Sequence, residues 1–328
     1  MIRAGYQIPL FTYPDTGPDA LFEQVTAQAV AAEEAGFDSV WVMDHFWQLP
    51  MMGPPELEML EAYTTLGALA MVTERVRLGT LVTGVTYRNP AMLAKILTTL
   101  DVASRGRAIC GIGAAWFEPE HDGLGFDFPP LRVRFEMLAE ALEILRAMFR
   151  DERPTISGTH YSVQDAINSP APVQPGGPPI MVGGSGEKKT LPMGARLADA
   201  INLSAGQSEL GRKMDVINAS LEEAGRDRDD FNVSWLATLV LGDSVDAAEQ
   251  KLREMIASRG MDPAVLDDES MRPMLLDRII VGDGEAALGR MREALDAGID
   301  GLIVNLPAEG GSTDAVRDAA AVLTELHS

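Results

Sequence analysis

A glycine-rich segment near the middle of the chain is the first candidate for chemistry. The apolar run 178–182 predicts a buried strand, which Gly183-Gly184-Ser185-Gly186 interrupts before apolar residues at helical spacing begin at Thr190. A strand, a glycine turn and a helix N-terminus together present free backbone N–H groups at the positive end of the helix dipole. Because glycine lacks a Cβ atom, a phosphate could approach this main chain closely. Tight strand-to-helix turns also need glycine, so a turn without a ligand is the competing interpretation.

A second candidate is the pair Asp44-His45, which directly follows the predicted strand 37–43. Imidazole titrates near neutral pH, so His45 could donate or accept a proton during a reaction. The same pair could equally be a structural hydrogen-bonded contact. Trp47 and Trp116 lie in predicted loops rather than on helix stripes, which favours the lining of a pocket over a place in the core.

Eight strand-then-helix units must position these groups. The predicted strands begin near residues 4, 37, 76, 107, 179, 199, 231 and 301. Such units in one chain of this length predict an α/β fold, a (β/α)8 TIM barrel forming one domain over residues 1–328, with insertions after strands 4 and 7. A doubly wound sheet would carry a glycine fingerprint after its first strand, and residues 8–12 contain none.

The carboxyl ends of the strands form one mouth in such a barrel. This rule brings Asp44-His45 together with Leu81-Val82-Thr83, Ala114-Ala115-Trp116 and the glycine-rich segment. A phosphate site on one wall and aromatic residues on another suit an elongated ligand with an anionic tail and a flat ring.

Composition limits the kinds of partner. The chain has 27 Lys plus Arg against 49 Asp plus Glu, a formal charge of −22, which argues against nucleic acid or an anionic membrane as a partner. Cys110 is the single cysteine and lies in an apolar run, so we expect a buried, inert thiol and no multi-cysteine metal site. The N-terminus has no signal-peptide pattern and no apolar run reaches membrane-spanning length. We therefore expect a soluble cytoplasmic protein without a metal centre.

Five segments resemble the bacterial luciferase-like family of flavin and deazaflavin (coenzyme F420) oxidoreductases. They occur in the order found in the family and comprise residues 35–46, 77–83, 88–91, 111–117 with Glu120-His121, and 181–188. The set is most similar to the F420-dependent branch. The resemblance therefore implies hydride transfer between C5 of F420 and a small organic substrate, and a homodimer, which is common in the family.

The resemblance also implies roles for individual residues. It places the cofactor phosphate at Gly183, Gly184, Ser185 and Gly186. It implies a bulge at Leu81-Val82, where a non-proline cis peptide backs the cofactor ring. His45 matches the proposed base of the family's sugar-phosphate dehydrogenases. The remaining predicted cofactor contacts are Asp44, Leu81, Val82, Thr83 and Ala114, and the predicted substrate contacts are Trp47 and Trp116.

One departure from the family pattern limits the substrate. The sugar-phosphate dehydrogenases carry an acidic residue, the proposed acid partner, where this chain has Trp116. An indole cannot act as that acid but can stack on a ring, so sugar-phosphate oxidation is not expected. Two other functions stay open: an FMN-dependent monooxygenase of the same family, and a protein that binds F420 without turnover.

Overall fold

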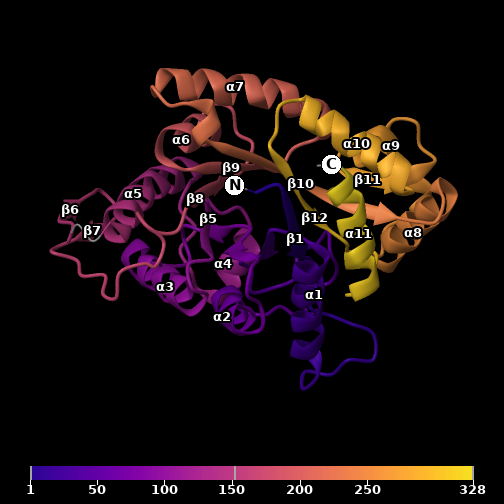
Figure 1. The fold of residues 1–328 in the computed structure, drawn as a ribbon, viewed down its shortest axis with the longest axis horizontal. Coiled ribbons are helices and arrows are strands. Elements are labelled where there is room, and N and C mark those ends of the chain that lie inside the picture. Colours follow the sequence, from indigo (N-terminus) through magenta and orange to yellow (C-terminus); the bar gives the residue numbers. More distant parts are fainter. Residues whose placement is uncertain (1, 151–152, 327–328) are drawn as a thin grey trace.

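The structure is a computed structural model that describes residues 2–150 and 153–326. Its parallel strands close into a barrel, because the last barrel strand pairs with the first and β9 pairs with β10. Figure 1 shows the helices surrounding these strands. The eight barrel strands are β1 (Ala4–Ile8), β2 (Ser39–Val42), β3 (Arg77–Thr80), β5 (Ala108–Gly113), β8 (Ile180–Gly183), β9 (Ala200–Leu203), β10 (Asn232–Leu241) and β12 (Gly301–Asn305). The predicted (β/α)8 barrel is confirmed.

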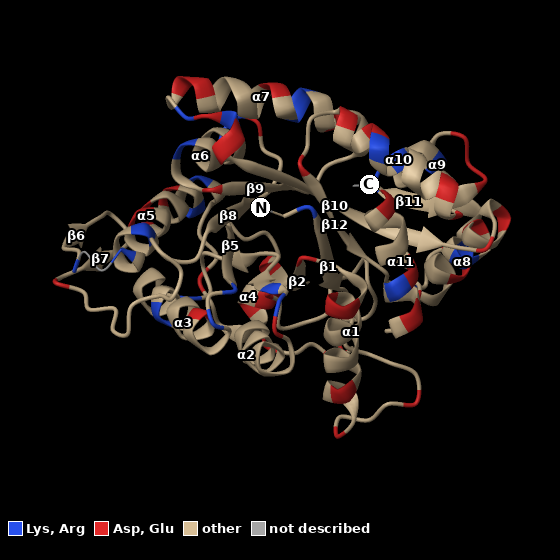
Figure 2. Ribbon diagram, viewed as in Figure 1, with Lys and Arg blue, Asp and Glu red and all other residues tan. Residues whose placement is uncertain are grey.

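The outer helices begin and end at recognisable signals. Asn89 accepts the N–H of Ala91 at 2.9 Å and precedes a proline, which starts one helix. Gly36 ends another at a φ of 101°, a conformation that favours glycine. The helices after the strands are α1 (Leu21–Ala35), α2 (Ala62–Val72), α3 (Pro90–Ala103), α5 (Leu131–Phe149), α6 (Thr190–Leu197), α7 (Leu210–Glu223), α8 (Val245–Ser258), α10 (Gly284–Asp296) and α11 (Thr313–Leu326). Figure 2 marks acidic residues along several of them, including α1 and α7.

Large side chains fill the barrel below its mouth. Trp41 is fully buried in a cluster with Ile109, Met181 and Ile303. A Cβ atom on Gly79 would lie 2.6 Å from the Trp41 ring, so a glycine is required opposite this indole. The interior is therefore a packed core, and the space for a ligand lies above it.

Two long connections interrupt the regular alternation. After β5 come α4 (Glu118–Leu124), α5 and the antiparallel hairpin of β6 (Ile156–Ser157) and β7 (Ser162–Val163). After β10 and α8 come α9 (Met271–Leu276) and β11 (Ile279–Gly282), which precede α10.

Two elements differ from the prediction. The segment 114–130, whose prolines, glycines and aspartates favour a loop, contains α4, whose end is capped by Gly125 at a φ of 72°. The strand β11 was not predicted; it pairs with residues 238–241 at the upper end of β10, outside the eight-strand barrel. Within the described residues, no helix is long and apolar enough to cross a membrane.

Candidate active site

A cavity of about 660 Å³ opens at the carboxyl ends of the barrel strands. Most of the predicted site residues line it: Asp44, His45, Leu81, Val82, Thr83, Ala114, Trp116, Gly183 and Gly184. The barrel thus brings four distant sequence segments into one site. Its size is within the usual range for small-molecule and cofactor sites.

The remaining three predicted residues are outside this lining. Trp47 packs against α4: a Cβ atom on Gly123 would lie 1.8 Å from its ring. Ser185 and Gly186 lie at the edge of the cavity, where the Ser185 hydroxyl accepts the backbone N–H of Ser204 at 3.0 Å and the Gly186 carbonyl accepts from Leu191.

The glycine-rich segment offers free backbone donors at its far end. The N–H of Gly184 already donates to the carbonyl of Asn202 at 3.0 Å. Within the described residues, the N–H groups of Ser185, Gly186, Glu187 and Lys188 have no acceptor. They precede α6, whose dipole favours an anion at this end. The available donors therefore lie one to two residues later than the glycines alone suggested.

Val82 forms the cavity wall beside Gly183 and is enclosed by glycines. The Leu81–Val82 peptide is cis, as predicted. A Cβ atom on Gly183 would lie 2.8 Å from both Val82 methyl groups, one on Gly113 3.0 Å from Cγ2, and one on Gly111 3.3 Å from Cγ1. These glycines thus keep room for the Val82 side chain at the cavity surface.

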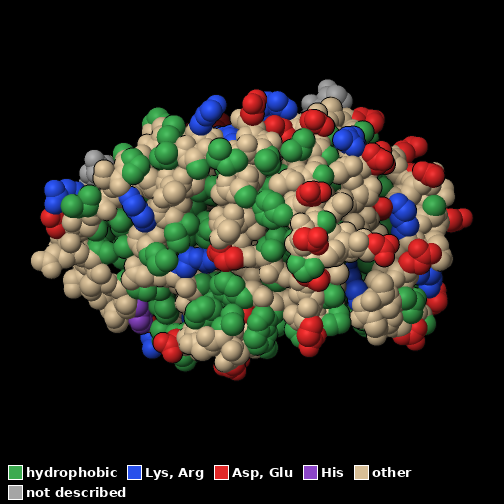
Figure 3. Space-filling model, turned by 90° about the horizontal axis from the view of Figure 1, so that it is seen from below, with side chains coloured by type: hydrophobic (Ala, Val, Ile, Leu, Met, Phe, Trp, Pro, Cys, Tyr) green, Lys and Arg blue, Asp and Glu red, His purple; other side chains and the backbone are tan. Residues whose placement is uncertain are grey.

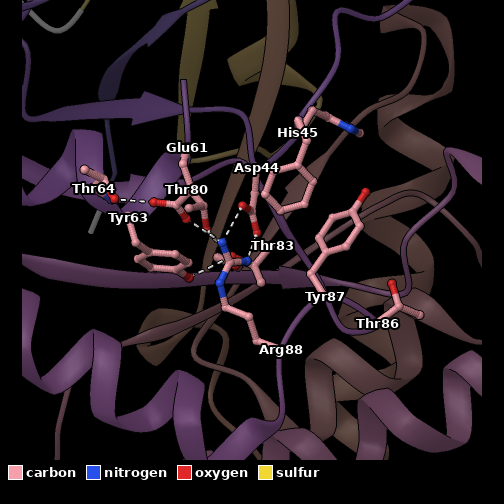
Figure 4. Close-up of polar contacts among 12 residues, drawn as sticks. Asp44, His45, Glu61, Tyr63, Thr64, Thr80, Thr83, Thr86, Tyr87 and Arg88 are labelled. Carbon is pink, nitrogen blue, oxygen red and sulfur yellow. Dashed lines mark hydrogen bonds and ion pairs between the residues drawn. The ribbon is translucent and has the colours of Figure 1, made fainter. Parts of the chain in front are cut away.

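Asp44 is held in a buried ion pair beneath His45. The Arg88 guanidinium donates to both of its carboxylate oxygens, at 2.6 and 3.1 Å, and to Glu61 at 2.6 Å. Figure 4 shows Arg88 between the two carboxylates. Burial raises the pKa of Asp44, and the charge of Arg88 opposes that rise. The pair fixes the Asp44 carboxylate firmly, so Asp44 is suited to hold a position rather than to exchange protons.

A chain of hydroxyl groups continues from this pair along the β3 bulge. The Tyr63 hydroxyl lies 2.7 Å from Thr83 Oγ1, which lies 2.9 Å from Thr80 Oγ1. Thr80 then donates to the carbonyl of Gly111 at 3.0 Å. Burial raises the pKa of Tyr63 far above the physiological range, so this chain stays protonated and positions the bulge.

Glu120, on α4, is a site residue that sequence reasoning missed as a functional group. Its carboxylate is fully buried and lies 3.0 Å from His45 Nδ1. It also accepts the Tyr87 hydroxyl and the N–H groups of Phe46 and Trp47. Burial alone would raise the pKa of Glu120, but the hydrogen bonds from His45, Tyr87 and Phe46 lower it. Glu120 is therefore an anion directly behind His45.

Its neighbour His121, also buried, has a structural role. Its Nε2 lies 2.7 Å from Thr86 Oγ1 and its Nδ1 lies 2.8 Å from the carbonyl of Phe117. Both ring nitrogens are thus occupied away from the cavity.

Apolar side chains surround the His45 end of the cavity. The Trp116 ring meets His45 edge-on, with centroids 5.8 Å apart and an interplanar angle of 74°. Trp116 is 54% exposed, so much of its ring is available to a ligand. The other apolar side chains lining the cavity include Met43, Leu49, Met51, Met52, Leu131 and Phe135. The described residues contain no group of three or more His, Cys, Asp or Glu side chains that could hold a metal ion.

Comparisons with known proteins identify relatives of this chain. The F420-dependent glucose-6-phosphate dehydrogenase of Microbacterium testaceum (strain StLB037) is 34% identical over 257 residues, which cover 77% of this chain and 72% of the relative. An F420-dependent secondary alcohol dehydrogenase in complex with an F420-acetone adduct has the same fold, with a TM-score of 0.80 and 23% identity over 99% of each chain.

The monooxygenase RslO1 from Streptomyces bottropensis also shares the fold, with a TM-score of 0.82 and 20% identity over 100% of each chain. The family model described as luciferase-like monooxygenase matches residues 3–327. The resemblance seen in the sequence is thereby confirmed, and the chain belongs to the luciferase-like monooxygenase family.

Proposed function

We propose that this protein is an F420-dependent oxidoreductase that transfers a hydride between C5 of the deazaflavin and a small organic substrate. The observation that carries the proposal is a single cavity that extends from Gly184 and Thr190, which flank the free backbone donors, to an imidazole backed by an anionic carboxylate. Sequence relatives named for F420-dependent dehydrogenation support the choice of cofactor. When bound, F420 would supply the two-electron chemistry, and the protein would supply binding, orientation and the proton.

The residues present fit such a cofactor. The free N–H groups of Ser185, Gly186 and Glu187 suit its phosphate. The Leu81-Val82 wall, with Thr83 and Ala114, suits the face of a flat ring. His45 has Nδ1 occupied by Glu120, which leaves Nε2 to exchange a proton with the substrate.

The substrate is, on this proposal, uncharged and largely apolar. Around His45 the cavity offers thioether, aliphatic and aromatic surface, with Glu120 and Asp44 adding negative charge behind it. Arg88 does not line the cavity, and its guanidinium is engaged by two carboxylates. Arg278 also lines the cavity and could attract an anion elsewhere in it, but Glu120 would repel a phosphate ester placed against His45, and Trp116 stands where the family's acid would be needed.

Two titrations and one kinetic screen test the proposal. Purified protein is titrated with F420 and with FMN, and the fluorescence of each cofactor is followed. We expect saturable binding of F420 alone; tight binding of FMN without F420 would instead favour a monooxygenase. Turnover is then measured as the change in F420 absorbance with propan-2-ol, cyclohexanol, cyclohexenone and glucose 6-phosphate. If F420 binds but no substrate in a broad set reacts, the result would favour a protein that binds F420 without catalysis.

We also propose a homodimer formed through α2 and α3. Large apolar side chains are exposed there: Met71 at 74%, Val72 at 46%, Met92 at 60% and Val102 at 41%. Figure 3, which views the molecule from the side of these helices in Figure 1, shows hydrophobic side chains gathered over a broad part of this face. Light scattering after size-exclusion chromatography should give twice the chain mass, and Met71→Glu combined with Met92→Glu should give the monomer.

A further inference from the structure

The hydrogen bonds around Glu120 determine which nitrogen of His45 carries a proton. A carboxylate can only accept hydrogen bonds. Glu120 Oε2 faces His45 Nδ1 at 3.0 Å, and the same oxygen accepts the Tyr87 hydroxyl. Nδ1 must therefore carry hydrogen, because a lone pair there would face the lone pairs of an anion. In neutral His45, Nε2 is then the unprotonated nitrogen.

The local backbone keeps Glu120 in this orientation. Its second oxygen, Oε1, accepts the N–H groups of Phe46 and Trp47, the two residues that follow His45. The carboxylate thus holds the main chain and the ring of the same loop at once. Edge-on contacts of His45 with Trp116 and Phe117, at 5.8 and 5.9 Å between centroids, restrict rotation of the ring further.

We infer that Glu120 is a positioning residue that selects the Nδ1–H tautomer of His45 and so makes Nε2 the proton acceptor of the site. This inference rests on the proposed function for its catalytic meaning, although the tautomer itself does not. In alcohol oxidation the substrate carbon would lose a hydride to the bound cofactor, while its O–H proton would pass to Nε2. The reverse reaction returns the proton from Nε2 to the carbonyl oxygen.

Glu120→Gln should invert this arrangement without changing the size of the side chain. The backbone N–H groups of Phe46 and Trp47 still require an acceptor, which only the amide oxygen of the glutamine can provide. The amide NH2 must therefore face His45 and Tyr87. A tyrosine hydroxyl can rotate to accept a hydrogen bond. His45 can accept from the amide only through an unprotonated Nδ1, which moves the hydrogen to Nε2. His45 Nε2 would then present a hydrogen-bond donor to the cavity in place of an acceptor.

Nitrogen-15 NMR of histidine-labelled protein without cofactor tests the inference directly. The chain has four histidines, and His45→Asn identifies the signal of interest. Spectra are recorded at pH 9, where an ordinary imidazole is neutral. We expect the Nδ1–H tautomer in the wild type and the Nε2–H tautomer in Glu120→Gln. Tyr87→Phe removes a second donor from the same oxygen and should keep the wild-type tautomer.

Kinetics separate positioning from folding. With an alcohol that the wild type oxidises, Glu120→Gln should lower kcat by about 10²- to 10⁴-fold, the usual contribution of a general base, while the dissociation constant of F420 changes less than about threefold. Glu140→Gln is the matched control: Glu140 accepts three backbone N–H groups at 2.8 to 2.9 Å in the distant hairpin. It should keep the wild-type kcat.

An Nε2–H tautomer in the wild type, or an unchanged Nδ1–H tautomer in folded Glu120→Gln, would overturn the inference. If Glu120→Gln does not fold, the wild-type spectrum still decides, because the carboxylate contact allows one tautomer only. If the wild type turns over none of the screened substrates, the proposed function fails while the tautomer measurement stands. The two ideas can thus fail separately.

Discussion

Replacement of Gly183 by alanine would test the wall that Val82 forms in the cavity. The added Cβ would lie 2.8 Å from each Val82 methyl group and 3.3 Å from its Cβ, closer than carbon atoms pack in proteins. Val82 cannot retreat toward the barrel, because Gly111 and Gly113 already leave it only enough room. The side chain must therefore shift toward the cavity, where the cofactor ring is proposed to lie.

Overpacking of this kind costs about 1–3 kcal/mol. If that cost falls on the bound state, the dissociation constant of F420 rises about 5- to 160-fold. Fluorescence titration measures the affinity, and urea unfolding followed by circular dichroism shows how much of the cost falls on the fold. The further replacement Val82→Ala should restore the affinity in part, because it removes both clashing methyl groups. A Gly183→Ala protein with wild-type affinity and wild-type unfolding midpoint would refute this packing argument.

Three further predictions concern stability and reactivity. Arg88→Met leaves Asp44 buried without its cation and should lower the free energy of unfolding by about 3–5 kcal/mol at pH 8. Burial raises the pKa of Asp44 in the folded state, so a fall in pH to 5 favours protonation of Asp44 in the folded protein. The loss of stability should therefore shrink between pH 8 and pH 5. Burial raises the pKa of the Cys110 thiol to about 12, so a disulfide reagent such as DTNB should react at pH 8 only after unfolding. Gly289→Ala, in the middle of α10 with open space around it, should raise the unfolding free energy by about 0.5–1 kcal/mol, and unchanged or lower stability would contradict that assignment.

The barrel could be predicted because each strand carries its own local signal. All eight barrel strands are short apolar runs followed by a turn and an amphipathic helix, and that alternation admits few topologies. The strand β11 is not predicted because its apolar run, Ile279-Ile280-Val281, is short. The run also directly follows the acidic stretch that ends at Arg278. Its pairing partner, the upper end of β10, is visible only in three dimensions.

The helix α4 was missed although its signals were present. Acidic residues and Pro119 in the first turn, with Gly125 after the last, are the usual marks of a helix start and stop. The density of proline, glycine and aspartate around them favoured a loop instead. That error also hid Glu120, because only a helix at this place brings its carboxylate to His45, 75 residues earlier in the chain.

The glycine-rich segment was located correctly, but its donors could not be assigned from sequence. The N–H of Gly184 donates to the carbonyl of Asn202 on the neighbouring strand, and Gly184 has a φ of 134°. A substitution there strains the backbone whatever its effect on a ligand, so a Gly184→Asp variant would not separate binding from folding.

The pairing of β11 has a consequence for how this protein can change over evolution. The lower half of β10 closes the barrel with β9 and β12, whereas β11 pairs only with residues 238–241 above them. The segment between α8 and β11 ends at Arg278, on the cavity wall. It can therefore lengthen, shorten or be exchanged for the corresponding segment of a relative without opening the barrel. Changes in this segment would alter the cavity wall at Arg278 while the eight barrel strands keep their pairing.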